Sequence, residues 1–218
     1  DEFITLKEAS VHCQINESDC TISMRWGDKI PFEKAELVAG VGNSANAAVA
    51  AARLGLPSAL LGIVGDDAYG KEILGVYKKE GLDRSYIEVQ KGIPTNHHYV
   101  LSYESERTIL VKHEKYRYAF PKRLPAPKVL YLSSLADCVE KDYYDALADF
   151  LDAHEEVFLA FQPGTFQMKQ GVEFLSRIYK RTDLFFCNKE EAARILKYEG
   201  EVIDLMQGLG PLGPRKML

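Results

Sequence analysis

AGVGNSANAAVAAARLG, residues 39–55, is the stretch that decides how this chain should fold. Gly40 and Gly42 allow the backbone to turn and to approach a ligand without a side chain in the way. Ser44 is a favoured N-cap residue, and the small residues after it predict a helix over residues 45–54 that packs closely against a sheet. The stretch therefore predicts a glycine loop that leads directly into a helix.

The amides of Asn43 and Asn46 should lie at the start of that helix, where each can both donate to and accept from a hydroxyl group. The same letters also satisfy GxGxxA, the dinucleotide fingerprint, in which an acid about 20 residues later binds a ribose. The preceding ELVAG is a poor buried strand, and Asp66 falls after the expected position. A nucleotide-dependent oxidoreductase is therefore the less favoured alternative.

The composition predicts one ordinary globular domain. The chain has 218 residues, 46% hydrophobic and 27% charged, and a domain of this size buries roughly 70% of the surface of its unfolded chain. The net charge of -5, with no cluster of basic and aromatic residues, argues against nucleic-acid binding. Apolar runs are too short to cross a bilayer, so we expect no membrane partner and a cytoplasmic location.

The four cysteines are widely spaced, without a CxxC pair. We interpret Cys13, Cys20, Cys138 and Cys187 as free, reduced thiols. Cys13 and Cys20 could face each other across a hairpin, and a bridge between them stays an alternative that a reducing compartment disfavours.

The order of apolar and polar segments predicts an α/β fold with a small β lid. Extended segments over about 10–37 and 95–113 should form the lid as antiparallel hairpins. Beyond them, buried strands alternate with amphipathic helices, which indicates a mostly parallel sheet with helices on both faces. The expected strands span residues 58–65, 128–134, 156–162 and 183–189, and the expected helices span 68–80, 142–153 and 167–179.

Polar residues follow each of these strands. In open α/β sheets, ligands bind beyond the carboxyl ends of the strands, so these residues should converge. They are Asp66 and Asp67, then Ser133 and Ser134, then Gln162 to Gly164, and finally Asn188.

The glycine loop, together with GIVGDDAYGKEIL at residues 62–74, resembles the first signature of the ribokinase (PfkB) family of carbohydrate and nucleoside kinases. The glycine pair, the asparagine, the LG after the helix and the GDDxxG turn occur in the same order. The resemblance implies a ribokinase-like fold in a single domain over residues 1–218. It also implies ATP-dependent phosphorylation of a hydroxymethyl group on a sugar or nucleoside, with Mg²⁺.

The same resemblance implies which residues hold the substrate. Gly42 and Asn46 would contact the sugar hydroxyls, with Asn43 close by. Asp1 opens DEFITLKEAS, which is similar to the segment that begins with the family's substrate-binding aspartate.

Three further side chains are candidates for the substrate site. His97 and His98 lie in an alternating strand, so one of them should face the ligand, although an ordinary strand histidine is the alternative. Gln162 takes the place where many of these kinases carry an acid or asparagine before a proline. We expect Gln162 to line the site without a direct catalytic part.

NKEE, residues 188–191, resembles the family's N-x-x-E motif, whose asparagine and glutamate organise magnesium and phosphate, largely through water. The resemblance implies that Asn188 and Glu191 bind the cofactor, with Glu191 on the metal side. Helix capping is the alternative, because asparagine at the N-cap with glutamate at N3 is a capping box.

The family's catalytic base is the last aspartate of a D-x-x-G-A-G-D run, and no such run occurs here. We therefore expect an incomplete kinase domain that carries the substrate-binding part, with the base beyond Leu218 and the C-terminal part of the fold absent. A non-catalytic sugar-binding or regulatory module is the alternative. Because lids of this family often pair between subunits, a homodimer through the β lid is the expected assembly.

Overall fold

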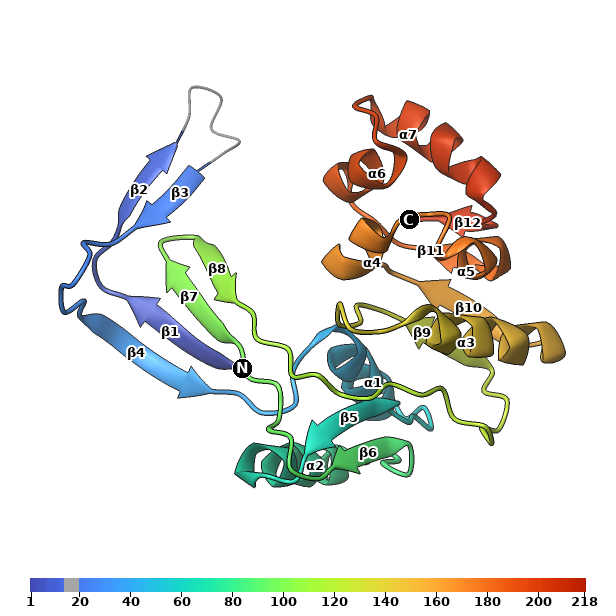
Figure 1. The fold of residues 1–218 in the computed structure, drawn as a ribbon, viewed down its shortest axis with the longest axis horizontal. Coiled ribbons are helices and arrows are strands. Elements are labelled where there is room, and N and C mark those ends of the chain that lie inside the picture. Colours follow the sequence, from blue (N-terminus) through green and yellow to red (C-terminus); the bar gives the residue numbers. More distant parts are fainter. Residues whose placement is uncertain (14–19) are drawn as a thin grey trace.

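The lid is a mixed sheet at one end of the molecule, with strand order β4-β1-β7-β8 (Figure 1). The computed structural model describes residues 1–13 and 20–218. Strand β1 pairs parallel to β7 and antiparallel to β4, and β7 pairs antiparallel to β8. The strands are β1 (Glu2–Leu6), β4 (Phe32–Leu37), β7 (Tyr99–Tyr103) and β8 (Glu106–Leu110). The structure thus adds β1 to the two predicted lid segments.

The segment that connects β1 to β4 in the sequence forms a narrow two-stranded ribbon that extends from the lid. It consists of β2 (Ser10–Cys13) and β3 (Cys20–Ser23), which pair antiparallel with each other (Figure 1). The predicted turn between them falls outside the described residues. Cys13 and Cys20 face each other and form a disulfide bond. The prediction of free thiols was therefore wrong for this pair, because cross-strand register outweighs an argument from compartment, whereas Cys138 and Cys187 are free.

A parallel sheet at the other end has the strand order β12-β11-β10-β9, which confirms the predicted α/β pattern. Its strands are β9 (Val129–Leu132), β10 (Phe158–Phe161), β11 (Leu184–Phe185) and β12 (Lys216–Met217). The helices of this part are α3 (Lys141–Ala153), α4 (Thr165–Gln170), α5 (Ser176–Arg181), α6 (Lys189–Leu196) and α7 (Val202–Leu209), followed by a 3-10 turn (Gly210–Leu212).

The helix predicted over residues 167–179 is two helices in the structure. Helix α4 ends at Gly171, whose φ of 89° lies in the left-handed region that favours glycine, and α5 begins at Ser176. The periodicity of the apolar residues continues through the break, so the pattern alone could not locate it.

The main core lies between this sheet and its helices. Leu147 and Leu151 of α3 and Ile178 of α5 are buried in one cluster with Leu159 and Phe161 of β10. Such residues each contribute about 1.5–3 kcal/mol by leaving water. This cluster holds the carboxyl ends of β9 and β10 at fixed positions.

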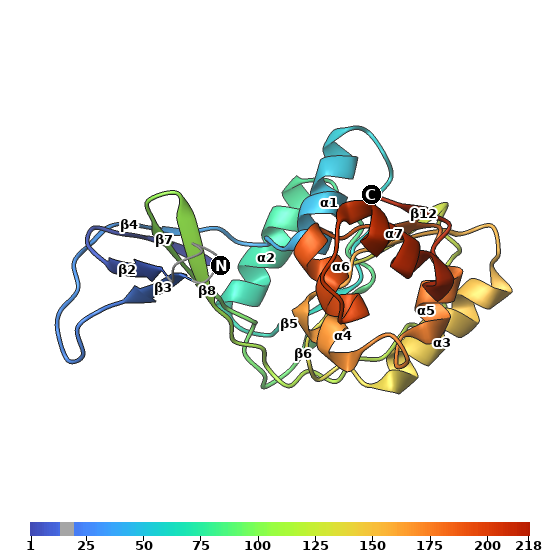
Figure 2. The same cartoon turned by 90° about the horizontal axis from the view of Figure 1, so that it is seen from above.

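A smaller unit connects the two ends of the molecule. Helix α1 (Asn43–Arg53), β5 (Gly62–Gly65), α2 (Ala68–Lys79) and β6 (Ile87–Gln90) follow in sequence, and β5 pairs parallel to β6. Ala45, Tyr77 and Leu82 form its own buried cluster. Figure 2 shows α1 and α2 between the lid and the larger sheet.

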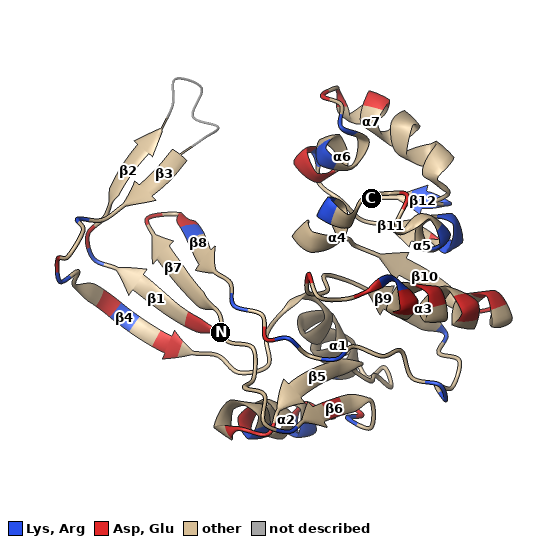
Figure 3. Ribbon diagram, in the orientation of Figure 1, with Lys and Arg blue, Asp and Glu red and all other residues tan. Residues whose placement is uncertain are grey.

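Acidic and basic residues both occur along the helices around the larger sheet (Figure 3). On α3, Asp149 and Asp152 each accept a hydrogen bond from Arg177 of α5 at 2.7 Å. No helix in residues 1–13 and 20–218 is long and apolar enough to cross a membrane.

Candidate substrate site

The glycine loop has the backbone conformation that its sequence predicts. Gly40 and Gly42 have φ values of 72° and 130°, which other residues rarely adopt. Gly42 is the N-cap of α1, and its carbonyl accepts the amide of Asn46 at 2.8 Å. The prediction that Ser44 caps the helix was wrong, because the Ser44 hydroxyl lies 2.5 Å from the Ser133 hydroxyl after β9 and bonds to it instead.

The loop meets the carboxyl ends of β9 and β10. Asn43 Nδ2 lies 3.4 Å from Ser134 Oγ. Gly164, which follows β10, lies against the same serine. A Cβ atom at Gly164 would be only 2.2 Å from Ser134 Oγ. The structure therefore brings the glycine loop to the end of β9, 91 residues away, and the end of β9 to the segment after β10, as parallel strand order predicts.

Asn46 lies on the same side of α1 as Asn43, because residues three apart are neighbours on a helix surface. Its side chain is exposed. Its amide can therefore reach a ligand that lies against the Asn43–Ser134 contact.

Asp1 lies on the lid, directly before β1. Its Oδ1 is 3.5 Å from Nδ1 of His98. The His98 ring lies 5.2 Å from the His113 ring, which in turn lies 5.3 Å from the ring of Phe166 in α4. This run of contacts joins the lid to the segment after β10.

His97 points away from Asp1. Its Nε2 is 3.5 Å from a Glu2 carboxylate oxygen, and its ring packs between Tyr69 and Tyr99 at 4.8 and 4.9 Å. These rings line a separate open pocket of about 320 Å³. The prediction that both histidines lie in a strand was wrong, because β7 begins only at Tyr99. The two side chains still have different partners, and His98, rather than His97, lies beside Asp1.

The pKa values of His98 and His113 are both lowered. Burial lowers the pKa of His98 from its ordinary value, and the neighbouring His113 lowers it further. Burial also lowers the pKa of His113, although Asp137 partly opposes this. At neutral pH both rings therefore offer uncharged polar edges.

Gln162 follows β10 and is fixed by a neighbour on β9. Its Oε1 accepts a hydrogen bond from the hydroxyl of Tyr131 at 2.5 Å. The side-chain oxygen of Gln162 is thus bound by Tyr131, and the side-chain NH₂ group remains to donate to a ligand.

Asn188 and Glu191 form the predicted capping box at the start of α6. Asn188 Oδ1 accepts from the Glu191 amide at 2.7 Å, and Glu191 Oε2 accepts from the Asn188 amide at 3.0 Å. Within the described residues Glu191 Oε1 makes no hydrogen bond, and no group of at least three metal-binding side chains occurs. One free carboxylate oxygen fits Mg²⁺, which is usually held by one or two carboxylates, phosphates and waters.

Sequence reasoning missed His113 and Phe166 as members of the site. His113 lies beyond the end of β8 and Phe166 in a short helix, so neither belongs to a motif. Their proximity depends on how the lid lies against the larger sheet, which no local pattern encodes.

The fold and site define the class of ribokinase-like α/β domains with a β lid. Arabidopsis thaliana ribokinase, solved with ribose and ATP, superimposes with a TM-score of 0.71 at 17% identity, covering 100% of this chain and 67% of that one. Cryptococcus neoformans var. grubii ribokinase, solved with ADP, gives a TM-score of 0.63 at 19% identity, covering 97% and 63%.

The family follows from sequence. Residues 13–214 match the family described as pfkB family carbohydrate kinase, and the chain belongs to that family. Bacillus subtilis ribokinase is 39% identical over 70 residues, which are 32% of this chain and 24% of that protein. The chain thus spans about two thirds of the solved structures' length and a quarter of this relative's.

Proposed function

We propose that this chain carries the substrate-binding part of a kinase that transfers a phosphoryl group from ATP to a hydroxymethyl group of a sugar or nucleoside. The observation that carries the proposal is the run of contacts from Asp1 through His98 and His113 to Phe166. This run links the lid aspartate to the segment after β10, whose Gly164 lies against Ser134, the serine that Asn43 contacts.

Each part of this site has a separate role in holding a polyhydroxylated substrate. The Asp1 carboxylate accepts hydrogen bonds from two neighbouring hydroxyls, which a neutral acceptor does less strongly. Asn46 and Asn43 donate to and accept from hydroxyls at the other side of the substrate, and Gly42 permits close approach of the backbone. The rings of His98 and Phe166 exclude water from the reacting hydroxyl.

Asn188 and Glu191 are the residues that we propose to hold Mg²⁺ and the nucleotide phosphates, through water. When bound, the metal–nucleotide complex supplies the phosphoryl group and neutralises its charge. No residue of this chain is proposed as the base that removes the hydroxyl proton.

The proposed assembly is a homodimer through the lid. Large apolar side chains on the lid and its ribbon are exposed, which is typical of a surface that another chain covers. They include Val11, Met24, Trp26, Phe32 and Leu110.

Replacement of Asn46 by alanine tests the substrate site. In the complete protein that carries this chain, phosphorylation of ribose, fructose and adenosine by ATP would be measured by mass spectrometry of the products. For the accepted substrate, Asn46→Ala should raise KM about 5- to 30-fold, because it removes hydrogen bonds worth about 1–2 kcal/mol.

Gln207→Ala is the matched control, since Gln207 is an exposed amide on α7, away from the site. Its KM should equal that of the unmodified protein. An unchanged KM in Asn46→Ala would contradict the site. Substrate binding by calorimetry without any product would contradict the kinase and support a non-catalytic binding module.

A further inference from the structure

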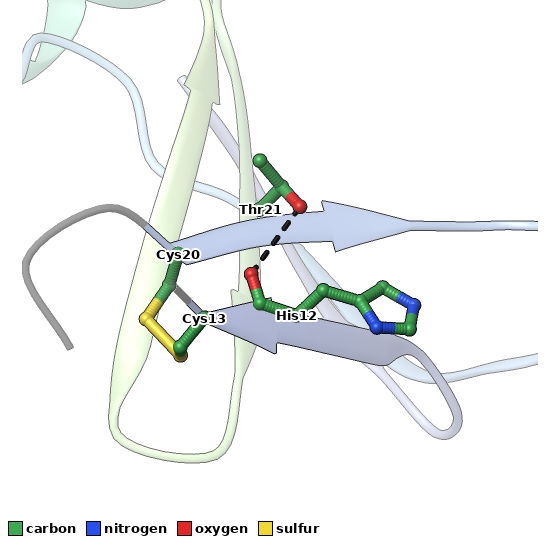
Figure 4. The surroundings of a disulfide bond; sticks show 4 residues. All are labelled: His12, Cys13, Cys20 and Thr21. Carbon is green, nitrogen blue, oxygen red and sulfur yellow. Dashed lines mark hydrogen bonds between the residues drawn. A yellow bond between two sulfur atoms is a disulfide. The ribbon is translucent and has the colours of Figure 1, made fainter. Parts of the chain in front are cut away.

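Cys13 and Cys20 occupy opposite positions on the two strands of the ribbon that extends from the lid. The register pairs Cys13 with Cys20 and His12 with Thr21, and the Cα atoms of the cysteines are 4.0 Å apart. Figure 4 shows the two sulfur atoms joined at the last described pair of the ribbon.

Within its described residues, the ribbon is held by strand pairing and has little buried surface. Every residue of β2 and all but Ile22 of β3 are exposed. Its side-chain hydrogen bonds, from Thr21 to the His12 carbonyl and from Ser23 to the Ser10 carbonyl, are 3.4 Å long. Because a two-stranded hairpin alone is marginal in water, we expect the covalent bond to contribute much of its stability.

The cysteines are also open to reagents. Both lie on exposed strand positions, and a thiol must approach a disulfide sulfur directly to react with it. Cys138 and Cys187 differ, because they are partly buried and burial raises the pKa of each thiol. Small-molecule thiols should therefore react with the Cys13–Cys20 disulfide more readily than oxidants react with Cys138 or Cys187.

We propose that Cys13 and Cys20 form a reversible redox modification site for small-molecule thiols, and that its oxidised state orders the ribbon. In reduction, a thiolate attacks one sulfur, the S–S bond breaks, and the other sulfur leaves as a thiolate that takes a proton. A second small thiol attacks the mixed disulfide and releases the second protein thiol. The net products are two protein thiols and one small-molecule disulfide.

The consequence for the lid follows from the position of the ribbon. Residues 7–31, which include it, connect β1 and β4, and these two strands pair along their whole length. The ribbon can therefore lose its order while the lid sheet keeps its pairing. The site changes the surface around Val11 and Met24, which are exposed, without unfolding the domain.

The experiment uses the complete protein in mixtures of reduced and oxidised glutathione. Alkylation after denaturation, read by mass spectrometry, should label Cys13 and Cys20 only in the reduced mixture. Amide hydrogen exchange in β2 and β3 should become at least about tenfold faster on reduction, while exchange in α3 stays unchanged.

Two variants complete the test. The double variant Cys13→Ser/Cys20→Ser should exchange rapidly in both mixtures, and Cys138→Ser should respond like the unmodified protein. Labelling of Cys13 and Cys20 even in fully oxidised glutathione would overturn the redox site. Equal ribbon exchange in both states would overturn its structural effect. None of these readouts depends on kinase activity.

Discussion

His98 and His113 are the residues at which the candidate site should respond to pH. Burial is the main cause that lowers the pKa of each, and their mutual proximity adds to it for His98. The charged amino group of Asp1 also lowers the pKa of His98, and a backbone hydrogen bond with Lys112 opposes these effects only in part. A histidine whose folded pKa lies below its unfolded value of about 6.5 binds more protons when unfolded. Its stabilising contribution is therefore complete above pH 6.5 and is lost as the pH falls.

Between pH 7.5 and pH 5, the melting temperature of the protein should consequently decrease. His98→Gln and His113→Gln should each make this decrease smaller, because a group that favours the neutral form is removed. His12→Gln, on an exposed position of β2, is the control and should follow the unmodified curve. The melting temperatures would be measured by scanning calorimetry. If they fall equally with pH in all variants, the two buried histidines do not cause the decrease.

At this scale the sequence could predict residue types but not which face each takes. Alternation predicts that His97 and His98 diverge, yet only the pairing of β1 with β7 places Asp1 beside His98. The cysteines show the same limit, since their bond depends on a register that the spacing permits and does not require.

Asp67 links three elements at the base of the lid. Its Oδ1 accepts the Gly70 amide of α2 at 2.9 Å and the Thr95 hydroxyl at 2.6 Å, and its Oδ2 accepts the Thr95 amide at 2.9 Å. Thr95 in turn accepts the amide of Gly65 at the end of β5. Burial alone would raise the pKa of Asp67, but the hydrogen bonds from Thr95 and Gly70 hold it below its ordinary value. Asp67 of the GDDAYG turn therefore has a structural role, because its hydrogen bonds connect α2 and the end of β5 to the segment at Thr95.

Replacement of Asp67 by alanine should lower the free energy of unfolding by about 2–4 kcal/mol, since it removes a helix cap and hydrogen bonds to a charged group. Urea unfolding measures this loss. The neighbouring Asp66→Ala is the matched control, because Asp66 accepts a hydrogen bond from the Gly92 amide at an exposed position. If both variants lose the same free energy of unfolding, the hydrogen bonds of Asp67 do not stabilise the protein more than the single bond of Asp66.

Most helices and strands could be predicted from sequence, because apolar spacing of two or 3.6 residues directly reflects burial. The exceptions have identifiable causes. Strand β1 was missed because FITL lies at the start of the chain without a hairpin signal, and the break at Gly171 depends on one left-handed residue. The site followed from strand ends and one family resemblance, whereas His113 and Phe166 required the packing of the lid.

The whole molecule has its buried core at one end and exposed apolar side chains at the other. The main cluster surrounds the sheet β9 to β12. The lid strands β4 and β8 have every residue exposed, and the lid and its ribbon carry several large apolar side chains. A lid built in this way is stabilised if a second copy covers it, which is the proposed homodimer.

Trp26 is the side chain that should decide this assembly, because it is 99% exposed on the lid segment and tryptophan is a frequent anchor of protein interfaces. Trp26→Ser should weaken dimerisation by about 2 kcal/mol, or about 30-fold in Kd, measured by sedimentation equilibrium of the complete protein. Leu54→Ser is the matched control, because Leu54 is 82% exposed at the end of α1, outside the lid, and its loss should leave Kd unchanged. A monomeric unmodified protein would contradict the homodimer itself. A dimer that tolerates Trp26→Ser, or that Leu54→Ser weakens equally, would place the interface away from this part of the lid.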